Sequence, residues 1–296
     1  LSHITVELAR FSWNPNPAPF FSLLMFYFSY LAVKKDSRYW LLVSVMFSIL
    51  AQLHYVALLS LAGAGVFFLL HLPKKTKKKD RQKLLKYTVL SILLFLLSLT
   101  PLILFDWKHD WRNVQAFTNI ITKEQSFDLQ RNTDRQGLET IIKFFTVDLR
   151  RQSKKVLFDS TFGDLGINNL FFYLTLLFVL VYLIKNRKKL PTSEQLLFSY
   201  LLTGLFGLSL YQHEVYTHYY AYLLPMIYIF YAWLLSKIKP KGLFYVISLI
   251  FLVFFISKNM NFYSLQASGW TINDVKRVAT SIQERVKNGE KYNLVL

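Results

Sequence analysis

Long apolar runs separated by short polar segments dominate the chain. The longest run extends from Trp40 to His71 and contains no Asp, Glu, Lys or Arg. As one helix it would measure about 48 Å, whereas a single crossing of a bilayer core needs only about 20 apolar residues. Basic residues flank the run at both ends, so it must cross the bilayer an even number of times. We therefore expect a hairpin of two short helices, 40–53 and 56–71, with its turn near His54.

The same pattern predicts eight membrane-crossing helices, which occupy residues 18–33, 40–53, 56–71, 86–104, 167–184, 195–211, 219–236 and 242–257. Residues 106–166 form a long polar loop without an apolar run of span length. Residues 258–296 have a soluble pattern, with an amphipathic helix over 273–287 and a strand over 292–296. The sequence therefore predicts an all-α integral membrane protein, with a polytopic transmembrane domain over 1–257 and the start of a soluble C-terminal α/β domain over 258–296.

The distribution of charged residues predicts which loops of this membrane protein face the cytoplasm. Hydrophobic residues make up 53% of the chain and aromatic residues 17%, and there is no Cys to form a disulfide. More than half of the Lys and Arg lie in four short segments that contain only three acidic residues, namely 34–40, 72–86, 185–194 and 237–241. Short basic loops remain cytoplasmic, so the hairpin turn and the 106–166 loop are expected outside. The net charge of +18 is thus a topology signal and an attraction to membrane lipids, and we expect no nucleic-acid partner.

The polar residues that can carry chemistry collect on the outer side under this topology. Six of them are candidates for binding a substrate, because each lies in or beside an outer loop: Asn14, His54, Asp106, His109, His218 and Tyr219. Basic side chains neutralise a phosphate, and a carboxylate can deprotonate an acceptor hydroxyl. We therefore expect these residues to handle an anionic lipid headgroup, such as a phosphate on a lipid carrier.

Each candidate also has a structural alternative. His54 can cap a helix end, and Asn14 can be an ordinary turn residue. The segment from Asp106 to Trp111 can be an interfacial anchor, and Tyr219 fits an aromatic belt at the membrane surface. Their shared placement on one face is the reason to consider them together.

Metal binding has weak support in the sequence. His213, Glu214 and His218 are the nearest approach to a ligand set, but their spacing is loose and one carboxylate with two His is a common combination. Motifs of soluble enzymes are missing as well, including phosphate-binding Gly-rich loops and zinc-protease motifs. The sequence thus implies no certain cofactor and leaves a divalent metal open.

One stretch of the outer loop is amphipathic. Between Gly137 and Phe158 apolar and basic residues alternate at helical spacing. Two interpretations are open: a helix that lies on the outer face of the membrane, or an ordinary amphipathic helix that packs on other loops.

Several motifs carry a resemblance to a known family. They are Trp13-Asn14-Pro15-Asn16 before a helix, a His at the hairpin turn, Thr100-Pro101-Leu102-Ile103-Leu104-Phe105-Asp106-Trp107-Lys108-His109, and Tyr219-Tyr220-Ala221-Tyr222-Leu223-Leu224-Pro225. Together they resemble bacterial members of the GT-C glycosyltransferase superfamily, namely the protein O-mannosyltransferase/aminoarabinose-transferase-like and Rgt-like groups. A soluble domain after the last helix is similar too.

The resemblance implies an inverting membrane glycosyltransferase. Such an enzyme moves a sugar from a polyprenyl-phosphate donor to a lipid, glycan or protein acceptor on the extracytoplasmic face of the cell membrane. The family's catalytic acidic residue lies in its first external loop, which precedes the region matching Leu1. We therefore expect a fragment that lacks its catalytic base and is inactive alone. By position, Asn14, Asp106 and His109 would line the donor or acceptor side of the cavity, and His54 its floor.

Two other functions use the same features. A transporter or flippase for lipid-linked saccharide needs a polar mouth without chemistry, but transporters place polar groups near the bilayer midplane. The second alternative is a non-catalytic membrane subunit. Such a subunit needs neither a large external loop nor a soluble tail, whereas this sequence predicts both. Turnover of a sugar would separate the transferase from both alternatives.

Overall fold

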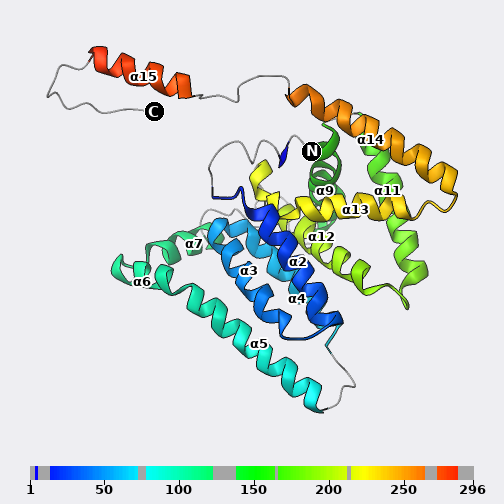
Figure 1. Ribbon diagram of the computed structural model, residues 1–296, viewed down its shortest axis with the longest axis horizontal. Helices are drawn as coiled ribbons and strands as arrows, with labels where there is room; N and C mark the ends of the chain where they lie inside the picture. Colours follow the sequence, from blue (N-terminus) through cyan, green and yellow to red (C-terminus); the bar gives the residue numbers. More distant parts are fainter. Residues whose placement is uncertain are drawn as a thin grey trace.

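The computed structural model describes a helical protein over residues 4–5, 14–72, 78–122, 138–163, 166–211, 215–263 and 272–285. Within these ranges every regular element is a helix and there is no strand, so the predicted all-α class is confirmed. Figure 1 shows a bundle of α2, α3, α4, α12 and α13, with α5 along one edge and α11 and α14 on the other side. The predicted strand over 292–296 lies outside the described residues.

The predicted hairpin is present and its turn is at His54. After α2 (Ala18–Lys34), the chain forms α3 (Tyr39–Leu53), the short 3-10 helix η1 (Tyr55–Leu58) and α4 (Leu59–Leu70). His54 has an extended backbone, with φ −162° and ψ 133°, which breaks the helix. The rings of Trp40 and Phe68 lie 5.1 Å apart, so the start of α3 meets the end of α4 and the two helices are antiparallel.

The predicted helix over 86–104 is instead two helices joined at an angle. α5 (Lys78–Ser98) begins eight residues earlier than predicted, and α6 (Thr100–Lys108) follows with a bend of 42°. Pro101 lies in the first turn of α6, where its missing N–H costs nothing, whereas inside one long helix it would remove a hydrogen bond and clash with the preceding turn. The proline therefore accounts for the bend.

Small residues allow the central helices to approach closely. α12 (Thr192–Leu210) packs against α4, and α13 (Leu224–Ser236) packs against α2 and α12. Gly63 faces the backbone of Tyr200, and Gly207 faces the side chain of Leu59. The Tyr200 hydroxyl is 3.2 Å from the hydroxyl of Ser29 in α2, which satisfies two polar groups inside the bundle. The core therefore lies where α2, α4 and α12 meet.

The predicted amphipathic stretch forms one helical segment, residues 138–162, with two turns of π-helix. Its elements are α8 (Leu138–Lys143), η2 (Phe144–Asp148), α9 (Leu149–Lys154), η3 (Lys155–Asp159) and α10 (Ser160–Phe162). Val156, Leu157 and Phe158 are buried, and α9 contacts α11 (Asn168–Asn186) and α12. The segment is thus an amphipathic helix packed on other helices, and the Tyr231 hydroxyl donates a hydrogen bond to the Leu157 carbonyl in its wider turn.

Three helices expose nearly continuous apolar surfaces. They are α5, α11 and α14 (Lys241–Tyr263), and their exposed side chains include Ile92, Leu97, Leu177, Ile184, Leu249 and Ile250. Within the described ranges one helix, α11, is long and apolar enough to be a candidate membrane span, and α5 with α6 adds a second candidate if the bent pair is one span. Among the described residues the other apolar helical stretches, including Lys241–Ser257 within α14, have 10–17 residues, so eight spans are not confirmed. α15 (Ile272–Arg285) matches the helix predicted over 273–287.

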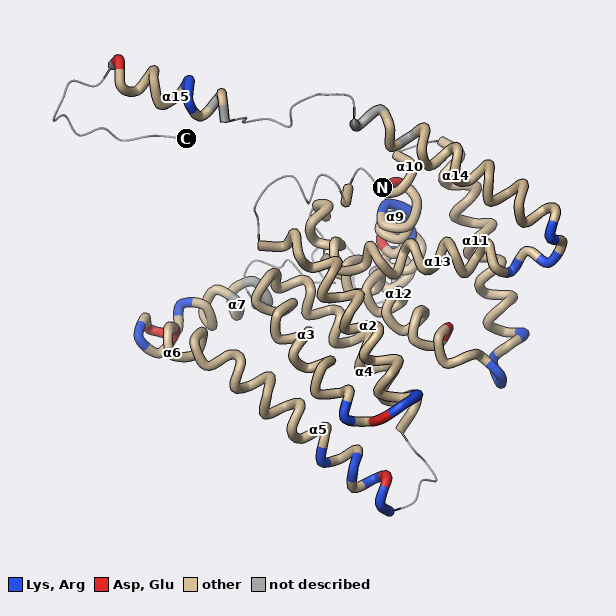
Figure 2. Tube along the Cα trace, in the orientation of Figure 1, with Lys and Arg blue, Asp and Glu red and all other residues tan. Residues whose placement is uncertain are grey.

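The basic connections lie along one side of the molecule. Figure 2 shows the Lys and Arg residues at the α2–α3, α11–α12 and α13–α14 connections and at the start of α5 along the lower and right-hand side. Two ion pairs tie these connections to helices: Lys83 of α5 with Asp36 at 2.7 Å, and Lys237, directly after α13, with Glu194 of α12 at 2.6 Å. The turn at His54 lies at the opposite end of α3 and α4.

Candidate functional site

The structure separates the six candidate residues into three groups. His54, His218 and Tyr219 lie together, although more than 150 residues separate the first from the other two. Asp106 and His109 lie at the corner between α6 and α7 (Arg112–Thr122). Asn14 lies in the exposed turn that precedes α2. Only the first group is formed by tertiary packing, so it is the candidate site.

His54 is fixed by the turn in which it lies. Its backbone N–H donates to the Leu50 carbonyl at the end of α3, and its carbonyl accepts from Ala57 in η1. The ring Nδ1 accepts the backbone N–H of Val56 at 3.2 Å. Because that N–H can only donate, Nδ1 carries a lone pair and the ring proton is on Nε2. The expectation that His54 could cap a helix end is confirmed, and Nε2–H remains as a donor.

His218 and Tyr219 are held by buried neighbours in the connection between α12 and α13. They belong to the 3-10 helix η4 (Thr217–Tyr219), and Val215 and Tyr220 beside it are almost completely buried. Ring centroids are 5.3 Å apart for His54 and His218, 5.2 Å for His54 and Tyr219, and 4.5 Å for His218 and Tyr219. All three side chains are half-buried, so the group keeps access to solvent.

Three more tyrosines complete a His–Tyr cluster, which consists of His54, Tyr55, Tyr211, Tyr216, His218 and Tyr219. Tyr55 stacks on His54 with centroids 4.7 Å apart, and Tyr216 stacks on His218 at 5.9 Å. The hydroxyls of Tyr55 and Tyr211 both interact with Tyr219. The sequence candidates did not include Tyr55 or Tyr211. Their only signal was position, since each directly adjoins a predicted outer turn.

The two histidines of the cluster are neutral at pH 7. Burial, and to a lesser degree the neighbouring His218, lowers the pKa of His54 from 6.5 to about 4. Burial also lowers the pKa of His218 below its ordinary value, and burial next to Tyr219 raises that of Tyr55. A neutral cluster cannot balance the charge of a phosphate. It offers ring faces and hydrogen-bond donors instead.

The Asp106 carboxylate has a local structural role. Its side chain is 3% exposed, and its two carboxylate oxygens accept the backbone N–H groups of Asn113 and Val114, each at 3.0 Å. These N–H groups open α7, where a helix leaves its donors without partners and favours a negative charge. The carboxylate therefore caps α7, and the structure does not bring it to His54.

His109 and Asn14 have local contacts of their own. The His109 ring stacks on Phe105 with centroids 4.1 Å apart, and its Nδ1 donates to the Phe105 carbonyl at 2.7 Å. Asn14 is exposed in a turn, as its alternative interpretation predicted. Neither residue contacts the His–Tyr cluster through an interaction seen between described residues.

No group of three or more His, Cys, Asp or Glu side chains within the described ranges is arranged to hold a metal. The loosely spaced set suggested by the sequence is not tested by this, because His213 and Glu214 lie outside the described residues. Of that set only His218 is placed, and its neighbours are His54 and tyrosines.

Comparison of the chain with models of protein families, with curated proteins and with solved structures found no match. The resemblance to GT-C glycosyltransferases therefore stays a prediction from the quoted motifs, and function has to be inferred from the geometry described above.

Proposed function

We propose that this chain is part of a multi-pass membrane glycosyltransferase that moves a sugar from a polyprenyl-phosphate donor to an acceptor at the extracytoplasmic face of the cell membrane. The observation that carries the proposal is the convergence of His54 with His218 and Tyr219 at the end of the bundle opposite the basic α2–α3 connection. Active sites commonly combine polar groups from chain segments that are far apart in sequence.

The chemistry of the cluster suits the sugar better than the phosphate. Its histidines are neutral at pH 7, so they act as hydrogen-bond groups and not as counterions. Ring faces pack against the apolar faces of a sugar, while the His54 Nε2–H and the tyrosine hydroxyls bond its hydroxyl groups. We assign His218 and Tyr219 to sugar binding, and we assign His54 to the floor of the same site.

The membrane location has separate support. Apolar side chains are exposed along the length of α5, α11 and α14, whereas soluble monomers rarely expose large contiguous apolar patches. The basic residues of the α2–α3, α11–α12 and α13–α14 connections and of the start of α5 gather at one side of the molecule, as the positive-inside rule requires of cytoplasmic loops. Under this proposal the short helices of the central bundle also lie within the membrane.

The topology is testable by cysteine labelling, because the chain contains no Cys. Gln52→Cys, near the hairpin turn, should react with a membrane-impermeant maleimide on intact cells. Lys188→Cys, at the α11–α12 connection, should react only after permeabilisation. Labelling of Lys188→Cys on intact cells, or recovery of the protein in the soluble fraction, would contradict the proposal.

The activity is testable with the complete gene product in membranes supplied with a polyprenyl-phosphate-linked sugar. Tyr219→Phe and His218→Asn should lower transfer at least tenfold, because the first removes a hydroxyl that bonds the sugar and the second removes a ring face that packs against it. His71→Asn is the matched control, since His71 lies at the other end of the same hairpin and bonds only locally to the Phe67 carbonyl. Transfer at the wild-type rate by all three variants would show that the cluster does not bind the sugar. Movement of unmodified lipid-linked sugar across the membrane without transfer would identify a flippase instead.

A further inference from the structure

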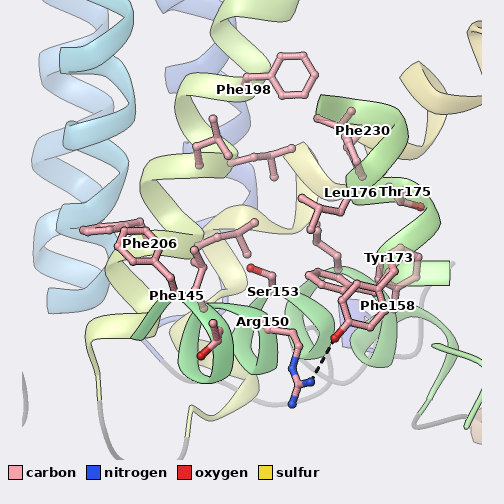
Figure 3. Close-up of a pocket in the computed structure, with 18 residues that line it drawn as sticks. Phe145, Arg150, Ser153, Phe158, Tyr173, Thr175, Leu176, Phe198, Phe206 and Phe230 are labelled. Atoms are coloured by element: carbon pink, nitrogen blue, oxygen red, sulfur yellow. Dashed lines mark hydrogen bonds between the residues drawn. The ribbon is translucent and has the colours of Figure 1, made fainter. Parts of the chain in front are cut away.

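A cavity of about 620 Å³ lies between the helical segment 138–162 and helices α11, α12 and α13. Its lining is almost wholly apolar and includes Phe145, Leu157, Phe158, Leu176, Leu202 and Phe206. Figure 3 shows Arg150 at its rim, where Nη1 donates to the Tyr173 hydroxyl at 3.2 Å. The volume falls within the roughly 300–1,000 Å³ of typical ligand sites. The cavity shares no residue with the His–Tyr cluster.

A second cavity of about 460 Å³ adjoins the first and is strongly basic. The two share Arg150, and the other charged residues in the second lining are Arg151, Lys154, Lys155 and Asp159. Lys154 lies 3.4 Å from Asp159, and Arg151 lies 3.4 Å from Asp148. Four cations against these two carboxylates leave a net charge of +2. A basic pocket at the mouth of an apolar cavity matches a molecule with a negative head and an apolar chain.

The long axis of the apolar cavity follows the helices. On α11 its lining runs from Phe172 to Val179, and on α12 from Phe206 back to Phe198, a length of about 12 Å at the helical rise. Arg150 and Tyr173 mark the end near the start of α11, and the other end points toward the basic connection at Lys188. In the proposed topology, the basic pocket lies at the outer surface and the apolar cavity descends into the hydrocarbon.

We propose that these two cavities form one binding site for an anionic phospholipid of the outer leaflet. One acyl chain occupies the apolar cavity, and the phosphate is bound by the Arg150 guanidinium and the Lys155 ammonium. A long polyprenyl chain would leave most of its length outside a cavity of this size. The inference rests on the membrane location proposed above and is independent of the transferase activity.

The test compares two lipids with the same chains, dimyristoylphosphatidylglycerol and dimyristoylphosphatidylcholine. Native mass spectrometry of the purified full-length protein measures how many molecules of each are retained and at what affinity. The wild-type protein should retain phosphatidylglycerol preferentially. Arg150→Gln/Lys155→Gln should weaken its binding roughly tenfold or more and abolish the preference. Lys188→Gln/Lys189→Gln removes two exposed lysines elsewhere and should leave both unchanged.

A second pair of variants tests the apolar cavity. Leu176→Trp places a bulky indole in the cavity and should reduce binding of both lipids, whereas Leu177→Trp, one residue away and outside the lining, should not. Both leucines are partly exposed, so both variants are expected to fold.

Three outcomes would overturn the inference. They are equal retention of the two lipids by the wild-type protein, equal weakening by the control lysine pair, and displacement of phosphatidylglycerol by an equimolar polyprenyl phosphate, which would assign the site to the donor. A protein that fractionates with membranes and transfers sugar, but shows one of these outcomes, contradicts the inference alone and leaves the proposed function standing.

Discussion

Gly63 and Tyr200 meet backbone to backbone: a Cβ atom added to Gly63 would lie 2.9 Å from the Cα of Tyr200. This contact sets the distance between α4 and α12, and it places the turn at His54 next to the end of α12. Close helix approach at a small residue is the usual way in which helices pack in a membrane. The candidate site therefore depends on a glycine of α4 that is not itself part of the His–Tyr cluster.

Gly63→Ala should destabilise the protein by about 1–3 kcal/mol, because the new methyl group meets backbone atoms that cannot move aside. Gly65→Ala in the same helix is the matched control, since nothing lies within 4 Å of its added Cβ. It should be neutral or stabilise by up to about 1 kcal/mol through helix propensity. Thermal unfolding in detergent measures both. Equal effects of the two substitutions would show that the α4–α12 contact does not limit stability.

The His–Tyr cluster should weaken at acidic pH. Because the pKa of His54 is about 4 in the folded protein and 6.5 ordinarily, the unfolded chain binds more protons between these values. The free energy of unfolding should thus be highest above pH 6.5 and fall as the pH drops toward 4. His54→Asn keeps an acceptor for the Val56 N–H but does not titrate, so its pH dependence should be flatter. An unchanged pH profile would mean that His54 is more solvated than its contacts indicate.

Asp106→Asn should lower stability by about 1–2 kcal/mol, since an amide NH₂ would then face one of the two N–H groups that the carboxylate accepts. Asp110→Asn is the control. Asp110 is exposed and has φ 56°, a conformation that Asn tolerates well. Circular dichroism during thermal unfolding gives both values. If Asp106→Asn kept full stability but lost sugar transfer, the residue would belong to the substrate site and not to the cap of α7.

Lys237→Met should destabilise the protein by about 1–3 kcal/mol, because it leaves the carboxylate of Glu194 buried without its counterion. Burial by itself would raise the pKa of Glu194, but hydrogen bonds from Lys237 and Tyr182 hold it below its ordinary value. Lys239→Met removes an exposed lysine two residues away and should have little effect. Recovery of stability in Lys237→Met with Glu194→Gln would identify the uncompensated charge as the cause.

Local features of the fold could be predicted from the sequence because they depend on neighbouring residues. The turn at His54 follows from a run too long for one helix, and the helix over 272–285 follows from its periodicity. The bend between α5 and α6 was missed, although Pro101 was a visible signal for it. The strand predicted over 292–296 lies outside the described residues and stays a prediction.

The same reasoning predicted only part of the candidate site. Listing polar residues near outer loops selected His54, His218 and Tyr219, which the structure brings together, but it selected Asp106 and His109 equally. Nothing in the sequence distinguished a carboxylate that caps α7 from one that faces a substrate. That distinction depends on which N–H groups lie within 3 Å of its oxygens.

By itself the sequence determined the helical class, the turn at His54 and the positions of the basic connections, because apolar periodicity, helix breaking and charge act over a few residues. Only the tertiary structure decided that Tyr55 and Tyr211 join the histidines, and that an apolar cavity adjoins Arg150. Both features arise from contacts between segments far apart in the chain. Such contacts depend on how helices pack around small residues such as Gly63, and no local pattern specifies that packing.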